Sequence, residues 1–348
     1  TMTVSDRYNR QRLVSGIGDA GQENIGRGHV AIVGVGALGC MSADMLARAG
    51  VGTITLIDRD IVEFTNLQRQ VLFTEDDAKT HQPKAAAAAK HLSSVNSEIQ
   101  IISHVEDLTP KNVNRLLDGA DIIIDGLDNF NTRYVLNDYA VKNNIPFLFA
   151  GVIAASGNVM TIIPSVTPCL RCLFPEPPPA GLQETCDTAG IIAPAIGIAA
   201  SCQCSDALKI LSNNLEKVSP TLLVFDLWNT QSSRLETGSP NESCECCSKN
   251  NDVFLESTDS PEAAALCGQN AVQIPSSGAI DLKTLANRLK DHGSFTQTGP
   301  VLRGSLFEEL SADEKNIVLL CFEDGRVIIH GTSDVGRAKA IFARFIGN

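Results

Sequence analysis

The sequence lacks an excess of basic residues and lacks long apolar runs, and each absence excludes a class of function. Its 28 Lys and Arg are outnumbered by 40 Asp and Glu, for a net charge of −12, so binding to a nucleic-acid backbone is not expected. No apolar run approaches the roughly 18 residues of a membrane-spanning helix, and the first residues contain no signal-peptide core. We therefore expect a soluble globular protein in the cytoplasm, without nucleic-acid or membrane partners.

The length and composition indicate a large domain followed by a smaller one. With 348 residues, 43% of them hydrophobic, the chain can bury a full core. A polar, turn-prone stretch near residue 250 indicates a boundary. Beyond it, the Asp324-Gly325 pair between apolar runs predicts a hairpin. We predict a main domain at residues 1–250, a linker at 251–264 and a small α+β module of unknown role at 265–348.

The stretch His29–Asp58 carries the motif around which the main domain is organised. It predicts a strand ending at Val33, a turn, a helix over about residues 38–49, and a second strand ending on Asp58. A glycine-rich turn between a strand and a helix is typical of nucleotide-binding βαβ units, where it receives phosphate groups. Asp58 stands where a carboxylate should accept the ribose hydroxyls. The motif alone leaves NAD, FAD and ATP open. Its three glycines are Gly34, Gly36 and Gly39.

Three charged residues follow in places that suit a bound anion or metal. Arg69 lies in an irregular loop after the second strand, and its planar fork can hold two phosphate oxygens. Lys84 is in the first turn of an alanine-rich helix, where its charge opposes the helix dipole, so an anionic ligand would explain it. Asp128 follows the buried strand 120–125 as a metal or catalytic candidate, or as the N-cap of helix 130–143. The alternation of strands and helices predicts a doubly wound, mainly parallel α/β sheet.

The cysteines point to metal chemistry more than to disulfides. Two C-x-x-C pairs stand in turn-rich segments more than seventy residues apart, a pattern that predicts a closed tetrathiolate zinc site. Cys246 lies inside the second pair and is interpreted as a bystander. The four predicted ligands are Cys169, Cys172, Cys244 and Cys247.

The remaining cysteines differ in their surroundings. Cys202 and Cys204 fall in an apolar helical run and are predicted to be core residues. Cys186 stands alone in a segment rich in proline and glycine. A thiol on a loop near an active site is a candidate nucleophile, although an isolated cysteine is more often inert.

Taken together, these motifs resemble a known family over residues 1 to about 250. The glycine turn, the Leu56-Ile57-Asp58 strand end, the paired cysteines and other short motifs occur in family order: Arg7-Tyr8-Asn9-Arg10-Gln11, Asn66-Leu67-Gln68-Arg69-Gln70, Gln82-Pro83-Lys84, Asp128-Asn129 and Thr185-Cys186. The chain resembles the adenylyltransferases that activate the sulfur-carrier proteins of molybdopterin and thiamine biosynthesis, which are bacterial relatives of the ubiquitin-activating enzymes.

The resemblance implies ATP as the nucleotide, with Mg²⁺ and Zn²⁺ as metals. In such enzymes the C-terminal Gly-Gly carboxylate of a ubiquitin-like carrier attacks the α-phosphate, which gives an acyl-adenylate and pyrophosphate. The implied partners are this carrier, a second copy of the chain, and a cysteine desulfurase or another sulfur donor. The resemblance implies that Asp58 binds the ribose and that Asp128 binds Mg²⁺. It implies that the phosphates are bound by the glycine turn (Gly34, Gly36 and Gly39) and by the side chains of Asn66, Arg69 and Lys84. It also implies that Arg10 reaches the γ-phosphate in the neighbouring subunit.

Several alternatives stay open. Cys186 matches a family cysteine that bonds to the carrier in some members and is dispensable in others. Activation for tRNA thiolation or protein conjugation, or of a substrate other than a carrier, is the alternative function. A nicotinamide oxidoreductase and a non-catalytic scaffold are the other classes. By itself the helix that contains Arg10 would be interpreted as a solvated surface helix.

Overall fold

The computed structural model describes residues 7–177, 189–256, 264–266, 270–275 and 278–347. The chain divides into two compact units, Thr1–Ser257 and Thr258–Asn348, and each is described by itself below. Among the described residues, none of the helices is both long enough and apolar enough to cross a bilayer.

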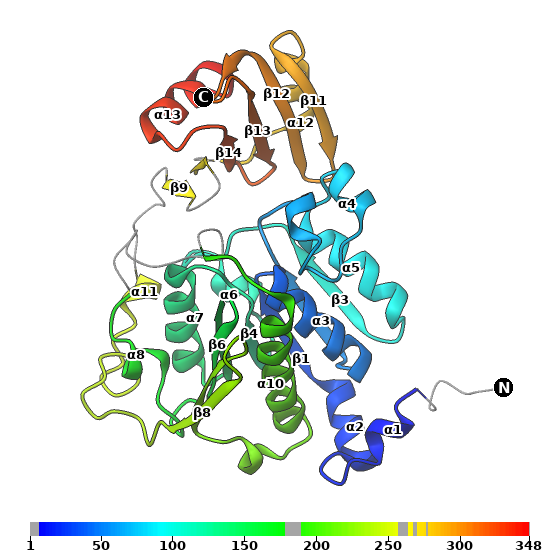
Figure 1. Ribbon diagram of the computed structural model, residues 1–348, viewed down its shortest axis with the longest axis vertical. Coiled ribbons are helices and arrows are strands. Elements are labelled where there is room, and N and C mark those ends of the chain that lie inside the picture. Colours follow the sequence, from blue (N-terminus) through cyan, green and yellow to red (C-terminus); the bar gives the residue numbers. More distant parts are fainter. Residues whose placement is uncertain (1–6, 178–188, 257–263, 267–269, 276–277, 348) are drawn as a thin grey trace, which may run out of the picture. The chain divides into compact units, whose positions relative to one another are not determined.

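The first unit is built on an eight-stranded mixed sheet with the order β3-β2-β1-β4-β5-β6-β7-β8 (Figure 1). The five strands from β3 to β5 are parallel neighbours and the last three are antiparallel. This confirms the predicted doubly wound, mainly parallel sheet with additional strands. The strands are β1 (His29–Val33), β2 (Thr53–Ile57), β3 (Gln100–His104), β4 (Ile122–Asp125), β5 (Phe147–Ile153), β6 (Ser156–Ile162), β7 (Thr221–Asp226) and β8 (Gln231–Glu236).

Helices cover both faces of this sheet. In β1, Val30 and Ile32 belong to a core cluster with residues of α3 and α5, whereas Ala31 and Val33 belong to a second cluster with residues of α7. Strand β1 is therefore buried on both faces, which is why its sequence is a nearly continuous apolar run. The helices are α1 (Asn9–Arg12), α2 (Gly18–Arg27), α3 (Ala37–Ala49), α4 (Glu75–Lys79), α5 (Lys84–Val95), α6 (Val113–Leu116), α7 (Phe130–Asn143), α8 (Leu170–Leu173), α10 (Ala193–Leu211) and α11 (Val253–Glu256), with short 3₁₀ turns at Phe64–Asn66 and Leu215–Lys217.

The local predictions differ in how well they match these elements. Helix α7 has the predicted bounds, and α3 begins one residue before its predicted start. Helix α6 begins only at Val113, after Asn112 accepts a hydrogen bond from the Thr109 backbone N–H at 2.8 Å and holds the preceding residues in a turn. The stretch predicted as a linker contains α11.

The second unit is a six-stranded sheet with the order β11-β12-β13-β14-β10-β9. Its neighbours are all antiparallel, and two helices contribute to its core. The predicted hairpin at Gly325 joins β13 to β14 and is confirmed, whereas β11 was not predicted because its residues are mostly polar. The elements are β9 (Ala264–Leu266), β10 (Ala271–Ile274), α12 (Leu282–Leu289), β11 (Gly293–Thr298), β12 (Val301–Leu310), β13 (Asn316–Phe322), β14 (Val327–His330) and α13 (Val335–Phe345).

Candidate functional site

The glycine turn between β1 and α3 contains two glycines that packing requires and one that it does not. Gly34 has a φ of +89°, and a Cβ on it would lie 2.5 Å from the carbonyl oxygen of Gly126. A Cβ on Gly39 would lie 1.9 Å from the carbonyl oxygen of Gly34. By contrast, the nearest atom to a Cβ on Gly36 would be the Gln70 Nε2, at 3.9 Å. Gly36 therefore borders open space, as a backbone that receives a phosphate should.

Gly126 is a third member of this packed contact, and its role was not predicted from the sequence. A Cβ on Gly126 would lie 2.2 Å from the Gly34 carbonyl oxygen and 3.1 Å from the Gly39 Cα. The segment after β4 is thus pressed against the turn after β1, since no side chain separates their backbones. This contact brings the region of Asp128 beside the glycine turn. A glycine directly after a buried strand was the available sequence signal.

The amino end of α3 is free to meet an anion. Gly36, which has no side chain to cap it, is its N-cap, and its first turn contains no acidic residue. The first N–H groups of an α-helix have no partner inside the helix, and the helix dipole adds partial positive charge there. The turn therefore combines unpaired donors with the open side of Gly36, which suits a phosphate group.

Asp58 lies directly after β2 and holds the turn through its carboxylate. Its Oδ2 accepts a hydrogen bond from the Val35 N–H at 2.6 Å, and its Oδ1 accepts one from the Asp60 N–H at 2.7 Å. Burial raises the pKa of Asp58 to about 6, although the nearby Lys84 cation opposes this rise. The carboxylate predicted to bind ribose thus also fixes the backbone beside it.

Lys84 is the first residue of α5, and its side chain is nearly buried. Its Nζ lies 3.2 Å from the Asp60 Oδ2. Burial alone would lower the pKa of Lys84, but the carboxylates of Asp60, Asp58 and Asp128 outweigh it and raise that pKa. Lys84 is therefore a fixed cation at the carboxyl edge of the sheet. Sequence reasoning missed Asp60 as its partner.

Asp128 lies close to this cation and is exposed. No hydrogen bond or ion pair within the described part of the chain holds its carboxylate. The alternative role as N-cap of α7 is wrong, because the cap is Asn129, whose Oδ1 accepts a hydrogen bond from the Thr132 N–H at 3.0 Å. The Asp128 carboxylate is therefore available to a metal ion or substrate.

The loop before Asp128 is braced by a buried ion pair that the sequence did not reveal. The Arg133 Nε donates to the Asp125 Oδ2 at 2.8 Å, and both side chains are buried. Arg133 also donates to the carbonyl oxygens of Leu127 and Ala150 at 2.5 and 3.0 Å. Because these bonds join α7 to the end of β4, to the loop itself and to β5, the loop has a fixed position.

Asn66 and Arg69 lie in the loop after β2, as predicted, but they differ in their engagement. Asn66 is buried, and its Oδ1 accepts a hydrogen bond from the Glu63 N–H at 2.8 Å. Arg69 donates from Nη1 to the Thr65 carbonyl oxygen at 3.0 Å, and no described carboxylate pairs with it. The other donors of the Arg69 guanidinium therefore remain available for a ligand.

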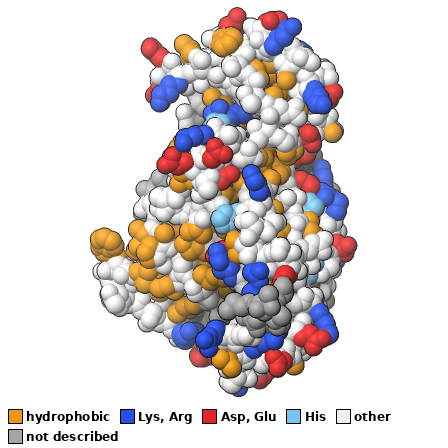
Figure 2. Space-filling model, turned by 90° about the vertical axis from the view of Figure 1, so that its right-hand side faces the viewer, with side chains coloured by type: hydrophobic (Ala, Val, Ile, Leu, Met, Phe, Trp, Pro, Cys, Tyr) orange, Lys and Arg blue, Asp and Glu red, His pale blue; other side chains and the backbone are white. Residues whose placement is uncertain are grey.

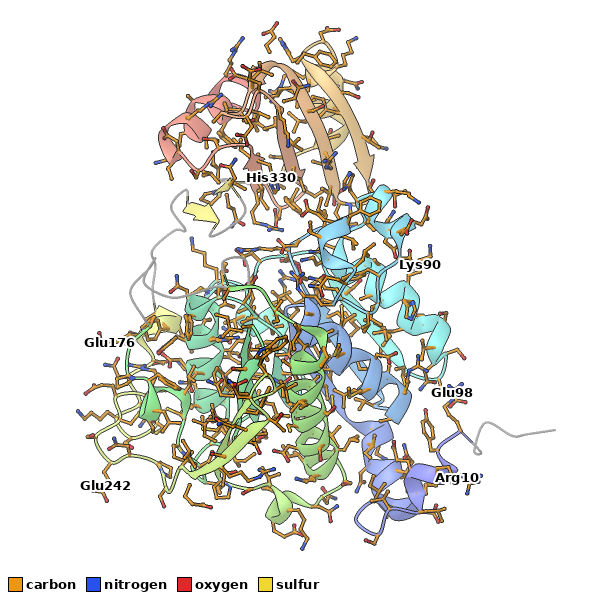
Figure 3. The ribbon with its side chains drawn as sticks, in the orientation of Figure 1. Arg10, Lys90, Glu98, Glu176, Glu242 and His330 are labelled. Carbon is orange, nitrogen blue, oxygen red and sulfur yellow. The ribbon has the colours of Figure 1, made fainter. Side chains whose placement is uncertain are left out.

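Arg10 is a predicted site residue that lies away from the glycine turn of its own chain. Arg10 is exposed on α1 (Figure 3). The neighbouring Tyr8 ring packs against Gly50, which caps the carboxyl end of α3. A helix of 13 residues is about 20 Å long, so Arg10 cannot reach the glycine turn of its own chain. Cys186 lies outside the described residues.

The four cysteines of the C-x-x-C pairs meet in space. Their sulfur atoms all lie within 4.8 Å of one another, and neighbouring pairs are 3.4, 3.6 and 3.8 Å apart. Tetrahedral zinc with bonds of about 2.3 Å separates its sulfur ligands by about 3.8 Å. The cluster is therefore compatible with the predicted zinc site. Its members are Cys169, Cys172, Cys244 and Cys247.

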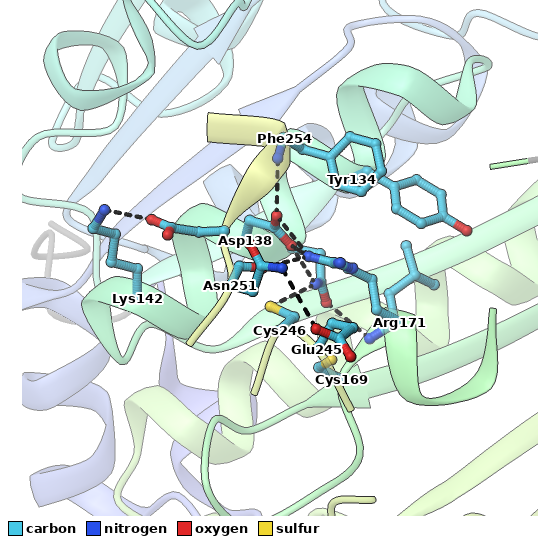
Figure 4. A network of polar contacts seen from close by, with 12 residues as sticks. Tyr134, Asp138, Lys142, Cys169, Arg171, Glu245, Cys246, Asn251 and Phe254 are labelled. Carbon is cyan, nitrogen blue, oxygen red and sulfur yellow. Dashed lines mark hydrogen bonds and ion pairs between the residues drawn. The ribbon is translucent and has the colours of Figure 1, made fainter. Parts of the chain in front are cut away.

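A buried network ties the cysteine loops to α7 (Figure 4). The Arg171 Nη1, between the first two cysteines, donates to both oxygens of Asp138 at 3.0 and 3.2 Å, and to the carbonyl oxygen of Asn251 at 2.8 Å. Cys246 is buried beside the cluster, and its Sγ accepts from the Asn137 Nδ2 at 3.5 Å. Cys246 thus has a structural partner on α7, which the sequence did not indicate.

One face of the molecule carries a gathering of hydrophobic side chains (Figure 2). Partly buried apolar side chains lie along α3 and α10, among them Met41, Met45, Ile198 and Cys202. Trp228, in the turn between β7 and β8, is 80% exposed. Large exposed apolar areas commonly mark contact surfaces for other molecules.

Comparison with known proteins places this geometry in a family. Residues 8–246 match the ThiF family. The chain is 43% identical over 347 residues to the sulfur carrier protein ThiS adenylyltransferase of Bacillus subtilis (strain 168), a match that covers 99% of this chain and 100% of that protein. It is 36% identical over 244 residues to the adenylyltransferase and sulfurtransferase MOCS3 of Aedes aegypti, which covers 70% of this chain and 55% of that protein.

Among solved structures, E. coli MccB with ATP has the same fold. The TM-score is 0.60 at 24% identity, over 70% of this chain and 74% of MccB. The family resemblance predicted from the motifs is confirmed, as is the class of enzyme, an adenylyltransferase. The chain therefore belongs to the ThiF family.

Proposed function

We propose that the chain adenylates the C-terminal Gly-Gly carboxylate of a ubiquitin-like sulfur-carrier protein with ATP and releases pyrophosphate. The observation that carries this proposal is the set of charges around the glycine turn. The buried Lys84 cation, the unpaired Asp128 carboxylate and the Arg69 guanidinium all belong to segments at the carboxyl edge of the sheet. Hydride transfer would need no such arrangement, whereas phosphoryl-centre chemistry depends on it.

In the proposed reaction, a carboxylate oxygen of the carrier forms a bond to the α-phosphorus. The bond from that phosphorus to the oxygen bridging it to the β-phosphate breaks, and pyrophosphate leaves with the electron pair. Lys84 and Arg69 would neutralise charge on the phosphates, and Asp58 would accept the ribose hydroxyls. Lys84 suits its role because neighbouring carboxylates raise its pKa and keep it protonated. Asp128 would hold Mg²⁺, which when bound supplies further charge neutralisation.

We propose that Arg10 acts in the site of a second copy of the chain. Arg10 is exposed and lies at the end of α3 opposite the glycine turn of its own chain, so a contribution to a nucleotide site requires another chain. This arrangement predicts a homodimer in which each site is built from two chains.

We propose that the four clustered cysteines bind a structural zinc ion. The sulfur separations support it, and four thiolates leave no open position for a substrate. Bound zinc would hold the loop after β6 against the segment after β8.

The thiamine-type carrier is the substrate that we favour. The Bacillus relative, named for ThiS, aligns with nearly the whole chain, including the second unit, whereas the match to MOCS3 covers 70% of the chain. A molybdopterin-type carrier, the other type that the sequence resemblance implies, is the second candidate. Mixing the protein separately with each type of carrier and measuring ATP–pyrophosphate exchange distinguishes them.

The exchange assay also tests the proposed reaction itself. Exchange should require a carrier that ends in Gly-Gly, and Asp128→Asn should abolish it without loss of folding, because no described residue forms a hydrogen bond or ion pair with that carboxylate. Asp118→Asn, at another exposed aspartate, is the matched control and should retain exchange. Absence of exchange with every carrier offered, or full activity of Asp128→Asn, would contradict the proposal.

A further inference from the structure

Gln70 is a buried polar side chain whose presence the fold does not explain. It is 4% exposed, and its Oε1 is enclosed without a hydrogen-bond partner. Nor does its Nε2 bond to any described residue. A buried amide that makes no hydrogen bond destabilises a fold, because it has lost its water and gained nothing in return. A ligand that accepts a hydrogen bond from the Gln70 Nε2 would offset part of this cost, so such a group is expected beside a ligand.

The position of the amide shows where that ligand lies. The Gln70 Nε2 would be 3.9 Å from a Cβ on Gly36, and it is the nearest atom to that point. The amide therefore faces the open side of the one glycine in the turn that packing does not require. The unpaired amino end of α3 begins at the same residue. Backbone donors and the Gln70 amide thus border one space.

We propose that Gln70 is a binding residue for the phosphate chain of the nucleotide. Its Nε2–H donates a hydrogen bond to a non-bridging phosphate oxygen seated against Gly36. A neutral amide donor suits this place, because Lys84 and Arg69 already supply positive charge to the site. The proposal rests on the proposed use of ATP, and it adds a contact that recognises the nucleotide before any carrier binds.

The test replaces Gln70 by methionine, which is similar in length and has no amide. ATP affinity is measured by calorimetry without a carrier, and apo stability by urea unfolding. For Gln70→Met we expect the Kd for ATP to rise about tenfold, which is about 1.4 kcal/mol, while the urea midpoint of the apo protein stays the same or rises. Gln70→Glu, which places a negative charge beside the phosphates, should weaken ATP binding further.

Gln22 provides the matched control, because it is equally buried but fully bonded. Its Nε2 donates to the Ala49 carbonyl oxygen at 3.0 Å, and its Oε1 accepts from the Gln11 Nε2 at 2.7 Å. Gln22→Met should lower the urea midpoint and leave the Kd for ATP unchanged.

An unchanged Kd for Gln70→Met, or a fall in its apo midpoint as large as that of Gln22→Met, would overturn the proposal and make Gln70 a structural residue. Failure of carrier adenylation would leave this result standing, since the titration contains ATP alone. The two proposals can therefore fail separately.

Discussion

Removing the charge of Asp138 should destabilise the first unit by about 3 kcal/mol or more. Asp138 is fully buried and Arg171 nearly so, and two hydrogen bonds of 3.0 and 3.2 Å join them. In Asp138→Asn the Arg171 guanidinium keeps its bond to the Asn251 carbonyl oxygen but loses its counter-ion. A buried charge left unpaired typically costs about 3–5 kcal/mol, and the remaining bond offsets only part of it.

Urea unfolding followed by circular dichroism measures this cost. The double variant Asp138→Asn/Arg171→Met should be more stable than Asp138→Asn alone, because it removes the unpaired cation and leaves an apolar stem beside the Phe254 ring, 5.1 Å from the guanidinium. The exposed pair Arg48–Asp44 on α3 is the control. Asp44→Asn should cost less than about 1 kcal/mol.

The refuting result is a cost for Asp138→Asn no larger than that of Asp44→Asn. A second readout follows from the position of Arg171 between two of the clustered cysteines. Because the ion pair holds that loop on α7, a chelator should extract zinc faster from Asp138→Asn than from the unaltered protein.

Three further predictions concern the nucleotide site. Burial raises the pKa of Asp58 to about 6, so Asp58 becomes protonated as the pH falls through this value and no longer accepts hydrogen bonds from the ribose hydroxyls. The affinity for ATP should therefore fall, which calorimetry from about pH 5 to about pH 8 can measure. The variant Asp58→Asn should bind ATP weakly at every pH and show no such fall. Gly36→Ala should keep the urea midpoint and lose ATP binding, whereas Gly39→Ala should lower the midpoint, because its Cβ would lie 1.9 Å from a backbone oxygen; equal midpoints would contradict this reasoning. The variants Arg10→Ala and Lys84→Ala should each be inactive alone, but should regain roughly a quarter of the exchange activity when the two chains are refolded together. Half of the dimers then contain one chain of each kind, and one of the two sites in each mixed dimer is intact. No recovery would place Arg10 outside the shared site.

Local patterns in the sequence were sufficient for the elements whose spacing is characteristic. The glycine turn follows from its glycine spacing, and the cysteine cluster follows from two C-x-x-C pairs. The signal for the turn lies within a few residues, and the signal for the cluster is a repeated cysteine pair whose four sulfur atoms must come together to bind one metal ion. The doubly wound, mainly parallel character of the sheet followed from the alternation of helices and strands.

Contacts between distant segments could not be predicted in this way. Nothing in the residues around Lys84 shows that Asp60 faces it, and nothing near Gly126 shows that it touches Gly34, because periodicity gives a face of an element and not the partner across the fold. The sequence could not show which of two neighbouring residues caps α7 either. Asp128 and Asn129 are both good N-caps, and only the backbone path selects Asn129.

The backbone contact among Gly34, Gly39 and Gly126 has a consequence for how this sequence can change over evolutionary time. A methyl group on any one of these glycines would collide with the backbone of at least one of the other two, so no stepwise route through single substitutions preserves the contact. In a library of single variants sorted only for folding, the three positions should be depleted together. Gly36 should vary freely in that selection and become restricted only when survival depends on the nucleotide.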